Sequence, residues 1–219
     1  MERLDLIAEQ IHQVFETRTA ARDRALSQAR TLTRHCANAI RAVHRDEQIL
    51  AQEQLDEARK LAISLHEDLS DYPDLYFAGY TQDALKEFAE ANIVYALVGN
   101  SDLPTPQDLG LEESTYVNGL AEAAGELRRR CLDILRHGYS QEAERLLSLM
   151  DDIYAVLITM DYPSAITGNL RRQTDIVRSV TERTRGDLTL SIRQEHLEQS
   201  IKHLEGRLEN LGEFSPNTQ

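Results

Sequence analysis

Apolar side chains recur every three to four residues over long segments of this sequence, and glycine and proline seldom interrupt them. The first segment, residues 2–46, carries the repeat on one set of side chains: Leu4, Ile7, Ile11, Val14, Phe15, Leu32, Cys36, Ile40 and Val43. Such spacing places an apolar stripe along an α-helix. The 219 residues include only ten glycines and five prolines, too few for the many turns of an all-β protein. The sequence therefore predicts an all-α fold.

Turn signals divide the chain into long helical segments. The expected helices span residues 2–46, 47–70, 75–98, 113–136, 141–160 and 170–211, and the loop 101–110 has room for one further turn. Ser140 is expected to cap the helix that follows it, and Gly186 marks a point where the last helix could break. No linker is long enough to separate two domains. Residues 1–211 are therefore expected to form a single domain, with 212–219 as a flexible tail.

Charge is unevenly distributed along the chain. The net charge of −13 argues against indiscriminate binding of nucleic acid. The segment 16–45 nevertheless holds seven arginines and only two acids, and four of its arginines share one helix face: Arg30, Arg34, Arg41 and Arg45. This arginine stripe would span about 22 Å, a length that suits a phosphate backbone. A solvated face that pairs with acids elsewhere explains the same pattern equally well. His44 is a further candidate for a phosphate contact.

Two pairs of carboxylates stand opposite the apolar stripes of their helices. Glu87 and Glu90 are three residues apart, and Glu122 and Glu126 are four residues apart, so each pair lies side by side on a helix surface. If the two faces meet, four carboxylates converge, which suits Mg²⁺ or Mn²⁺ better than zinc. No histidine follows these glutamates at the spacing of a di-iron bundle. On spacing alone, a solvated acidic surface is the more common explanation.

Other sequence signals place the chain in a reducing, aqueous compartment. Cys36 and Cys131 lie far apart among apolar helical positions, which indicates buried thiols. The first residues contain no apolar signal-peptide region, and no run of residues is long and apolar enough to span a membrane. We therefore expect a cytoplasmic protein with no membrane association.

Several segments resemble the translin family, and in particular its Trax (translin-associated factor X) members. The segment 85–91 resembles Leu-Gln-Glu-Tyr-Val-Glu-Ala of Trax, and 119–128 resembles Gly-Val-Ala-Asp-Leu-Thr-Gly-Glu-Leu-Met of the same protein. Residues 29–33, together with His44-Arg45, resemble its first helix. The segments 170–172 and 191–193 resemble the last helix of translin. The resemblance is collinear over about residues 3–205, and the order and spacing of the segments make it specific.

The resemblance implies a Trax-like subunit of prokaryotic origin, a bundle of about seven helices that assembles into a hollow octameric shell around RNA. Trax subunits are Mg²⁺-dependent endoribonucleases. By resemblance, Glu87, Glu90 and Glu122 would bind the metal, with Glu126 as a neighbouring catalytic acid, and the substrate would be single-stranded or short duplex RNA. Trax has aspartate where Glu122 stands, so this chain carries the same charge one methylene further from the backbone.

Two alternatives remain open at the level of sequence. One is a translin-like protein that binds RNA or single-stranded DNA without cleaving it. The other is an all-α nucleotide pyrophosphohydrolase, which also uses pairs of helical carboxylates with Mg²⁺. Glu87 and Glu90 fit its first motif, but Gly125 stands where the second motif needs an acid.

Overall fold

The computed structural model describes residues 2–138 and 141–212. Across these ranges the chain forms helices and no strands, which confirms the predicted all-α fold. Six helices are long: α1 (Glu2–His44), α2 (Gln48–Asp68), α4 (Gly79–Gly99), α6 (Glu113–Leu135), α7 (Gln141–Leu157) and α9 (Leu170–Gly212). Three are single turns: α3 (Pro73–Tyr76), α5 (Pro106–Leu109) and α8 (Ser164–Thr167).

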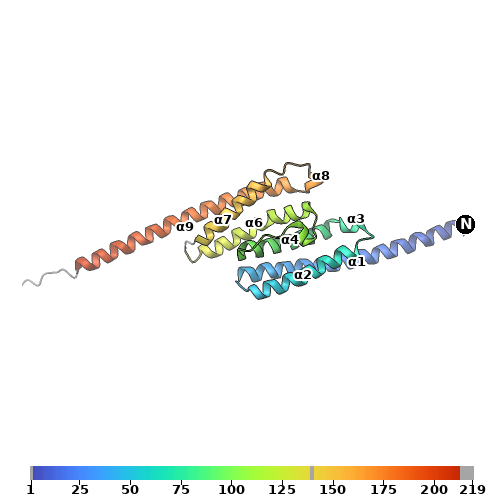
Figure 1. Ribbon diagram of the computed structural model, residues 1–219, viewed down its shortest axis with the longest axis horizontal. Helices are drawn as coiled ribbons and strands as arrows, with labels where there is room; N and C mark the ends of the chain where they lie inside the picture. The colour runs from blue at the N-terminus through green and yellow to red at the C-terminus, as the bar shows by residue number, and fades with distance from the viewer. Residues whose placement is uncertain (1, 139–140, 213–219) are drawn as a thin grey trace, which may run out of the picture.

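The long helices stack in three layers (Figure 1). The inner half of α1 and α2 form the first layer, α4 and α6 the second, and α7 with the first half of α9 the third. One hydrophobic core runs through all three layers, and some of its large side chains are almost fully buried: Leu32, Leu65, Phe88, Leu127 and Met150. Because the middle layer is covered on both sides, α4 contributes ten buried residues. A polar side chain on α4 that faces α6 is therefore held inside the protein.

The two helices of the middle layer approach each other most closely at Gly119. A Cβ atom at this position would lie 2.7 Å from Ala89 Cβ and 2.9 Å from the carbonyl oxygen of Lys86. Glycine is thus the residue that allows α6 to touch the backbone of α4 here. This contact sets the spacing of the side chains on either side of it, including Glu90 on α4 and Glu122 one turn further along α6.

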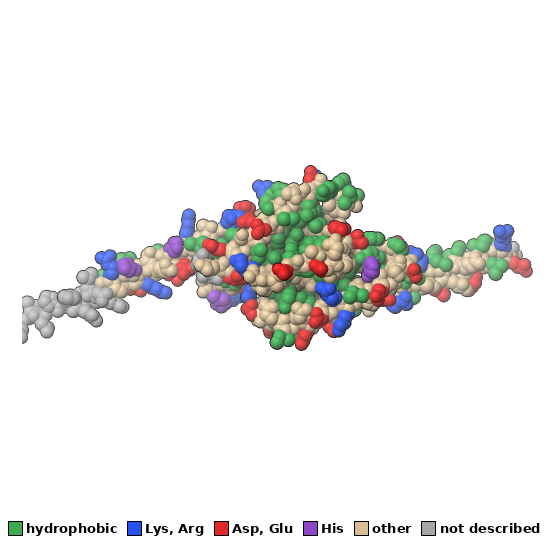
Figure 2. All heavy atoms as spheres, viewed as in Figure 1, with side chains coloured by type: hydrophobic (Ala, Val, Ile, Leu, Met, Phe, Trp, Pro, Cys, Tyr) green, Lys and Arg blue, Asp and Glu red, His purple; other side chains and the backbone are tan. Residues whose placement is uncertain are grey.

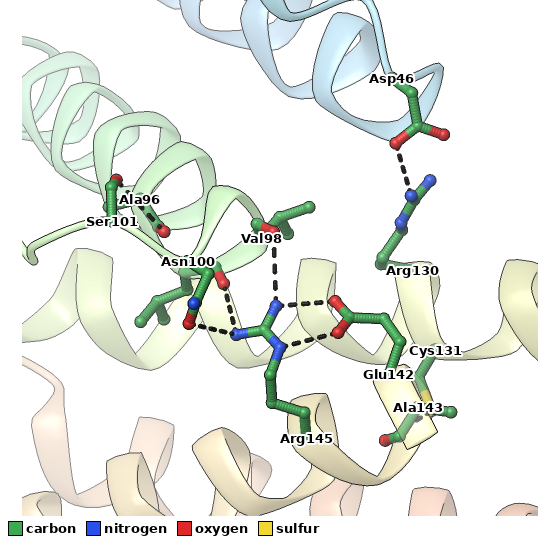
Figure 3. Close-up of polar contacts among 11 residues, drawn as sticks. Asp46, Ala96, Val98, Asn100, Ser101, Arg130, Cys131, Glu142, Ala143 and Arg145 are labelled. Carbon is green, nitrogen blue, oxygen red and sulfur yellow. Dashed lines mark hydrogen bonds and ion pairs between the residues drawn. The ribbon is translucent and has the colours of Figure 1, made fainter. Parts of the chain in front are cut away.

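Polar contacts tie the layers together at one end of the bundle (Figure 3). Arg145 on α7 donates hydrogen bonds to the carbonyl oxygens of Leu97 (3.0 Å) and Val98 (3.3 Å), which α4 leaves unpaired at its C-terminus. Glu142 pairs with the same guanidinium at 2.7 Å. On the other side, Arg130 of α6 bonds the carboxylate of Asp46 at 2.5 Å, just after α1 ends. The C-terminal parts of α4 and α6 are therefore each tied to a neighbouring layer, α4 to α7 and α6 to the end of α1.

The long helices begin and end close to the predicted positions, but three local features differ. The turn α8 was not expected from the sequence. The helix expected from residue 75 is divided, because Pro73 starts a separate turn and the extended backbone of Ala78 begins α4. Gly186 does not break α9: Arg128 of α6 donates to Thr184 Oγ1 at 3.0 Å and pairs with Asp187 at 2.9 Å. These contacts lie on either side of Gly186 and hold this part of α9 against α6, although a glycine inside a helix costs about 1 kcal/mol. The proposed cap Ser140 and the tail residues 213–219 lie outside the described residues.

Both ends of the described chain project from the bundle as bare helical arms (Figure 1). Apolar side chains remain exposed on the first turns of α1, as Figure 2 shows, and on the last turns of α9. They are Leu4, Leu6, Ile7, Ile11, Val14 and Phe15 on the first arm, and Leu190, Leu197, Ile201, Leu204 and Leu208 on the second. The apolar repeat of residues 2–15 therefore does not contribute to the core of the subunit. Among the residues described, no helix is long and apolar enough to cross a membrane.

Candidate metal centre

Three carboxylates converge where α4 faces α6. One oxygen each of Glu87, Glu90 and Glu122 lies within 4.8 Å of the others. Glu87 and Glu90 come from successive turns of α4, and Glu122 follows Gly119 by one turn on α6. The close helix contact at Gly119 thus brings the acidic face of one helix against that of the other. The two faces identified in the sequence do meet, and they meet inside the middle layer of the fold, where Glu90 is buried and Glu87 and Glu122 are half-buried.

Burial and mutual repulsion weaken the acidity of these groups. Glu90 is only 8% exposed. Burial, followed by the charges of Glu87, Glu122 and Glu126, raises the pKa of Glu90 to about 8. Burial and the charge of Glu122 also raise the pKa of Glu87. Without a bound cation, Glu90 is therefore largely protonated at neutral pH. A divalent cation at the cluster would supply the charge that keeps all three groups ionised.

Two neighbouring side chains hold Glu122 in place. Lys86 Nζ lies 2.9 Å from Glu122 Oε1, and Gln173 of α9 donates a hydrogen bond of 2.9 Å to the same oxygen. Lys86 also lies 3.8 Å from Asp83. The cluster therefore has one ammonium group at its edge. Sequence analysis missed Lys86 and Gln173; the position of Lys86 next to Glu87 was the only signal for the first, and no pattern indicated the second.

The fourth predicted acid, Glu126, is bound by histidine. The imidazole Nε2 of His44 donates to Glu126 Oε2 at 2.5 Å, and Arg129 lies 3.6 Å from the same carboxylate oxygen. The hydrogen bond from His44 lowers the pKa of Glu126, so this group is ionised at neutral pH. The side chain of His44 is only 5% exposed, and its Nδ1 has no partner among the described residues. The structure thus places His44 against the acidic cluster.

The arginine stripe lies on a different face of the subunit from the carboxylate cluster. Arg30, Arg34, Arg41 and Arg45 are all exposed, on the side of α1 opposite its buried face. Within the described part of the chain, none of them has an ion-pair partner, and Arg41 contacts only the amide of Asn38. Because α4 packs on the buried side of α1, the stripe and the carboxylate cluster belong to different faces of one subunit. No acid among the described residues forms an ion pair with the stripe.

Comparison with known proteins places this arrangement in a family. No family model matches the chain. The uncharacterized protein MJ0175 of Methanocaldococcus jannaschii is 32% identical over 188 residues, which cover 85% of this chain and 83% of the relative. AfC3PO, solved alone and in complex with duplex RNA, superposes with a TM-score of 0.78 at 29% identity. The match covers 85% of this chain and 96–97% of AfC3PO. Apo-NeC3PO, at 19% identity and a TM-score of 0.77 over 84% of this chain and 96% of its own, shares the fold.

The fold and the site define an all-helical protein with a cluster of three acids between its two central helices. The chain belongs to the translin family, as a Trax-like member with a prokaryotic relative.

Proposed function

We propose that this protein is a Mg²⁺-dependent endoribonuclease. The observation that carries the proposal is the convergence of Glu87, Glu90 and Glu122 within 4.8 Å at a partly buried position. Three carboxylates held this close repel one another, and nothing in the packing of the bundle requires them. The fold is maintained by an apolar core to which they contribute no side chain. A bound cation would offset the repulsion among the three carboxylates, and a cation site would therefore account for the arrangement.

The cluster fits a hard divalent cation. All of its donors are carboxylate oxygens, which Mg²⁺ prefers and for which Mn²⁺ can substitute. When bound, the metal would activate water and stabilise charge on the phosphate in the transition state. Glu87, Glu90 and Glu122 would hold it. Glu126, kept ionised and oriented by His44, would accept a hydrogen bond from the attacking water.

RNA is the substrate that the family resemblance favours. AfC3PO, 29% identical to this chain, has been solved with duplex RNA. On this chain, the four arginines of the stripe are exposed and unpaired within the described structure, and they would bind the phosphate backbone. His44 is the remaining residue proposed from the sequence for phosphate contact, and its hydrogen bond to Glu126 places it at the edge of the carboxylate cluster.

The bare arms support an assembly of several copies, and we propose a homo-octameric shell. On α9, Leu190, Leu197 and Leu204 are seven residues apart, and Ile201 and Leu208 fall between and after them. This is the apolar pattern of a coiled-coil seam. Residues 4, 7, 11 and 14 repeat it on α1. In a shell, such seams would be covered, and the arginine stripe of one subunit would share an RNA strand with the carboxylates of another.

Labelled RNA incubated with and without Mg²⁺ tests the proposal. We expect cleavage that requires Mg²⁺ and is abolished by Glu90→Gln, while RNA binding measured in EDTA is retained. Glu113→Gln is the matched control, because Glu113 is an exposed acid at the start of α6. RNA that is bound but left intact by the wild-type protein in Mg²⁺ would establish the non-catalytic alternative.

A further inference from the structure

A cavity of about 410 Å³ opens beside the carboxylate cluster, between α4, α6 and α8. Lys86 and Gln173 line this cavity, and both also bind Glu122 Oε1 at 2.9 Å. The cavity therefore adjoins the candidate metal centre, with the side chains of Lys86 and Gln173 between them. Its volume lies within the range typical of small-molecule sites.

Hydrogen bonds within the protein hold the walls of the cavity in place. Asn118 donates to the carbonyl oxygens of Ser114 (2.7 Å) and Thr167 (2.8 Å), which ties α8 to α6. Gln82 accepts from Thr115 and donates to the carbonyl of Tyr76. With these bonds made, the side-chain oxygen Oδ1 of Asn118 has no partner among the described residues. The side-chain amide of Asn169 has none there either. Both are free to bind a polar ligand.

An aromatic ring stands at the edge of the cavity. Phe77 is 59% exposed, which is unusual for phenylalanine. Its ring is supported edge-to-face by Tyr76 at 5.1 Å, and Tyr76 is supported in turn by His66 at 5.3 Å. The ring of Phe77 therefore contacts one aromatic neighbour, Tyr76, which is itself packed against His66. Fixed, exposed rings are the surfaces on which proteins stack the bases of single-stranded nucleic acid.

We propose that this cavity binds the nucleoside of an unpaired ribonucleotide next to the cleaved phosphate, a proposal that rests on the proposed endoribonuclease function. Phe77 would stack on the base, and the amides of Asn118 and Asn169 would contact its edge. Lys86, released from Glu122 when a divalent cation takes its place, would contact the neighbouring phosphate. The edge of a base in a duplex is already paired, so the RNA must be single-stranded at this position.

Binding of a single nucleotide tests the cavity directly. We would titrate adenosine 5′-monophosphate and uridine 5′-monophosphate into the full-length protein in EDTA and follow binding by NMR. Removing a stacking ring weakens binding by about tenfold or more. We therefore expect saturable binding by the wild-type protein and at least a tenfold loss for Phe77→Ala. Tyr162→Ala is the matched control, because Tyr162 is 64% exposed and does not line the cavity. Asn169→Ala gives a second variant at an exposed position.

The result separates the two proposals. If the nucleotides do not bind, or bind equally well to wild type, Phe77→Ala and Asn169→Ala, the nucleoside cavity is overturned, whatever the protein does to RNA. If the nucleotides bind as expected but RNA is not cut in Mg²⁺, the endoribonuclease proposal fails while the cavity is retained as a nucleotide site. Cleavage together with a raised KM and little change in kcat for Phe77→Ala would support both.

Discussion

Glu90 is the carboxylate whose surroundings deviate most from those of a surface acid. It sits on α4, in the middle layer of the fold, with Glu87, Glu122 and Glu126 nearby. Its pKa of about 8, against an ordinary value of 4.5, means that folding without a metal makes this group harder to ionise. A cation at the cluster would reverse that effect. The pH dependence of stability therefore reports on the site without any assay of activity.

We predict that in EDTA the wild-type protein loses stability relative to Glu90→Gln as pH rises. Between pH 4.5 and about 8 the folded state holds a proton on Glu90 that the unfolded state releases, so the free energy of unfolding falls with pH across this window. Glutamine removes the titrating group. The melting temperatures of the two proteins should be similar near pH 5, and the variant should be the more stable one at pH 8. A difference that does not change with pH would show that Glu90 titrates normally.

At the scale of secondary structure, the contact between α4 and α6 determines whether the carboxylates form a site. Their oxygens come from two helices, and the distance between those helices depends on the missing side chain at Gly119. A second glycine on α6, Gly125, has nothing within 4 Å of its Cβ position and is exposed. Gly119 is thus needed for the packing of α6 against α4, whereas packing places no constraint on Gly125.

We predict that Gly119→Ala destabilises the protein and weakens Mg²⁺ binding, whereas Gly125→Ala does neither. The new Cβ at 119 would lie 2.7 Å from Ala89 Cβ, so the helices must separate, at a cost of about 1–3 kcal/mol. At 125 alanine should stabilise the helix by up to about 1 kcal/mol. Urea unfolding and titration of Mg²⁺ or Mn²⁺ would measure both effects. Equal behaviour of the two variants would mean that the α4–α6 spacing does not depend on Gly119.

At the scale of the whole molecule, two features of the surface stand out: the exposed apolar side chains of the two arms and the arginine stripe. The two arms extend beyond the layered bundle (Figure 1), and the arginine stripe faces away from the carboxylates. Within one described subunit, the apolar side chains of the arms are not buried and the arginines of the stripe form no ion pair. The proposed assembly around RNA would account for both features.

We predict that the combined substitution Leu197→Glu and Leu204→Glu dissociates the assembly. The two leucines are 60% and 57% exposed in one subunit and occupy successive equivalent positions of the seam on α9. Charged side chains there should not be buried against another copy. Light scattering should give a smaller mass for the variant, while Gln199→Glu, on the outer side of the same helix, should leave the mass unchanged. A wild-type protein that scatters as a 24.9 kDa monomer would contradict the shell.

We also predict that Arg34→Ala and Arg41→Ala each reduce the salt dependence of RNA binding. One lost phosphate contact should lower the slope of log affinity against log salt by about 0.7 for single-stranded RNA. Sequence preference should not change, because phosphate contacts position a nucleic acid without reading its bases. Arg183→Ala, an exposed arginine on α9, serves as the control. Unchanged slopes in both test variants would exclude the stripe as the RNA-binding surface.

The helices could be predicted from the sequence because helix formation depends on local patterns. Apolar spacing and turn signals predicted most boundaries, and α4, expected to end at residue 98, does end at Gly99, with Asn100 in the left-handed conformation. Spacing also showed that Glu87 and Glu90 share one face, as do Glu122 and Glu126. It could not show that Gly186 stays helical, since that depends on contacts with Arg128 from a distant part of the chain.

The sequence by itself determined the all-α class, the positions of the long helices and the acidic and basic faces, because each follows from the geometry of a single helix. Only the tertiary structure decided which faces meet. Packing at Gly119 brought three carboxylates together, burial raised the pKa of Glu90, and α1 carried His44 to Glu126. The same packing left the arginine stripe on another face. These outcomes depend on distances between helices, which no periodicity within one helix can specify.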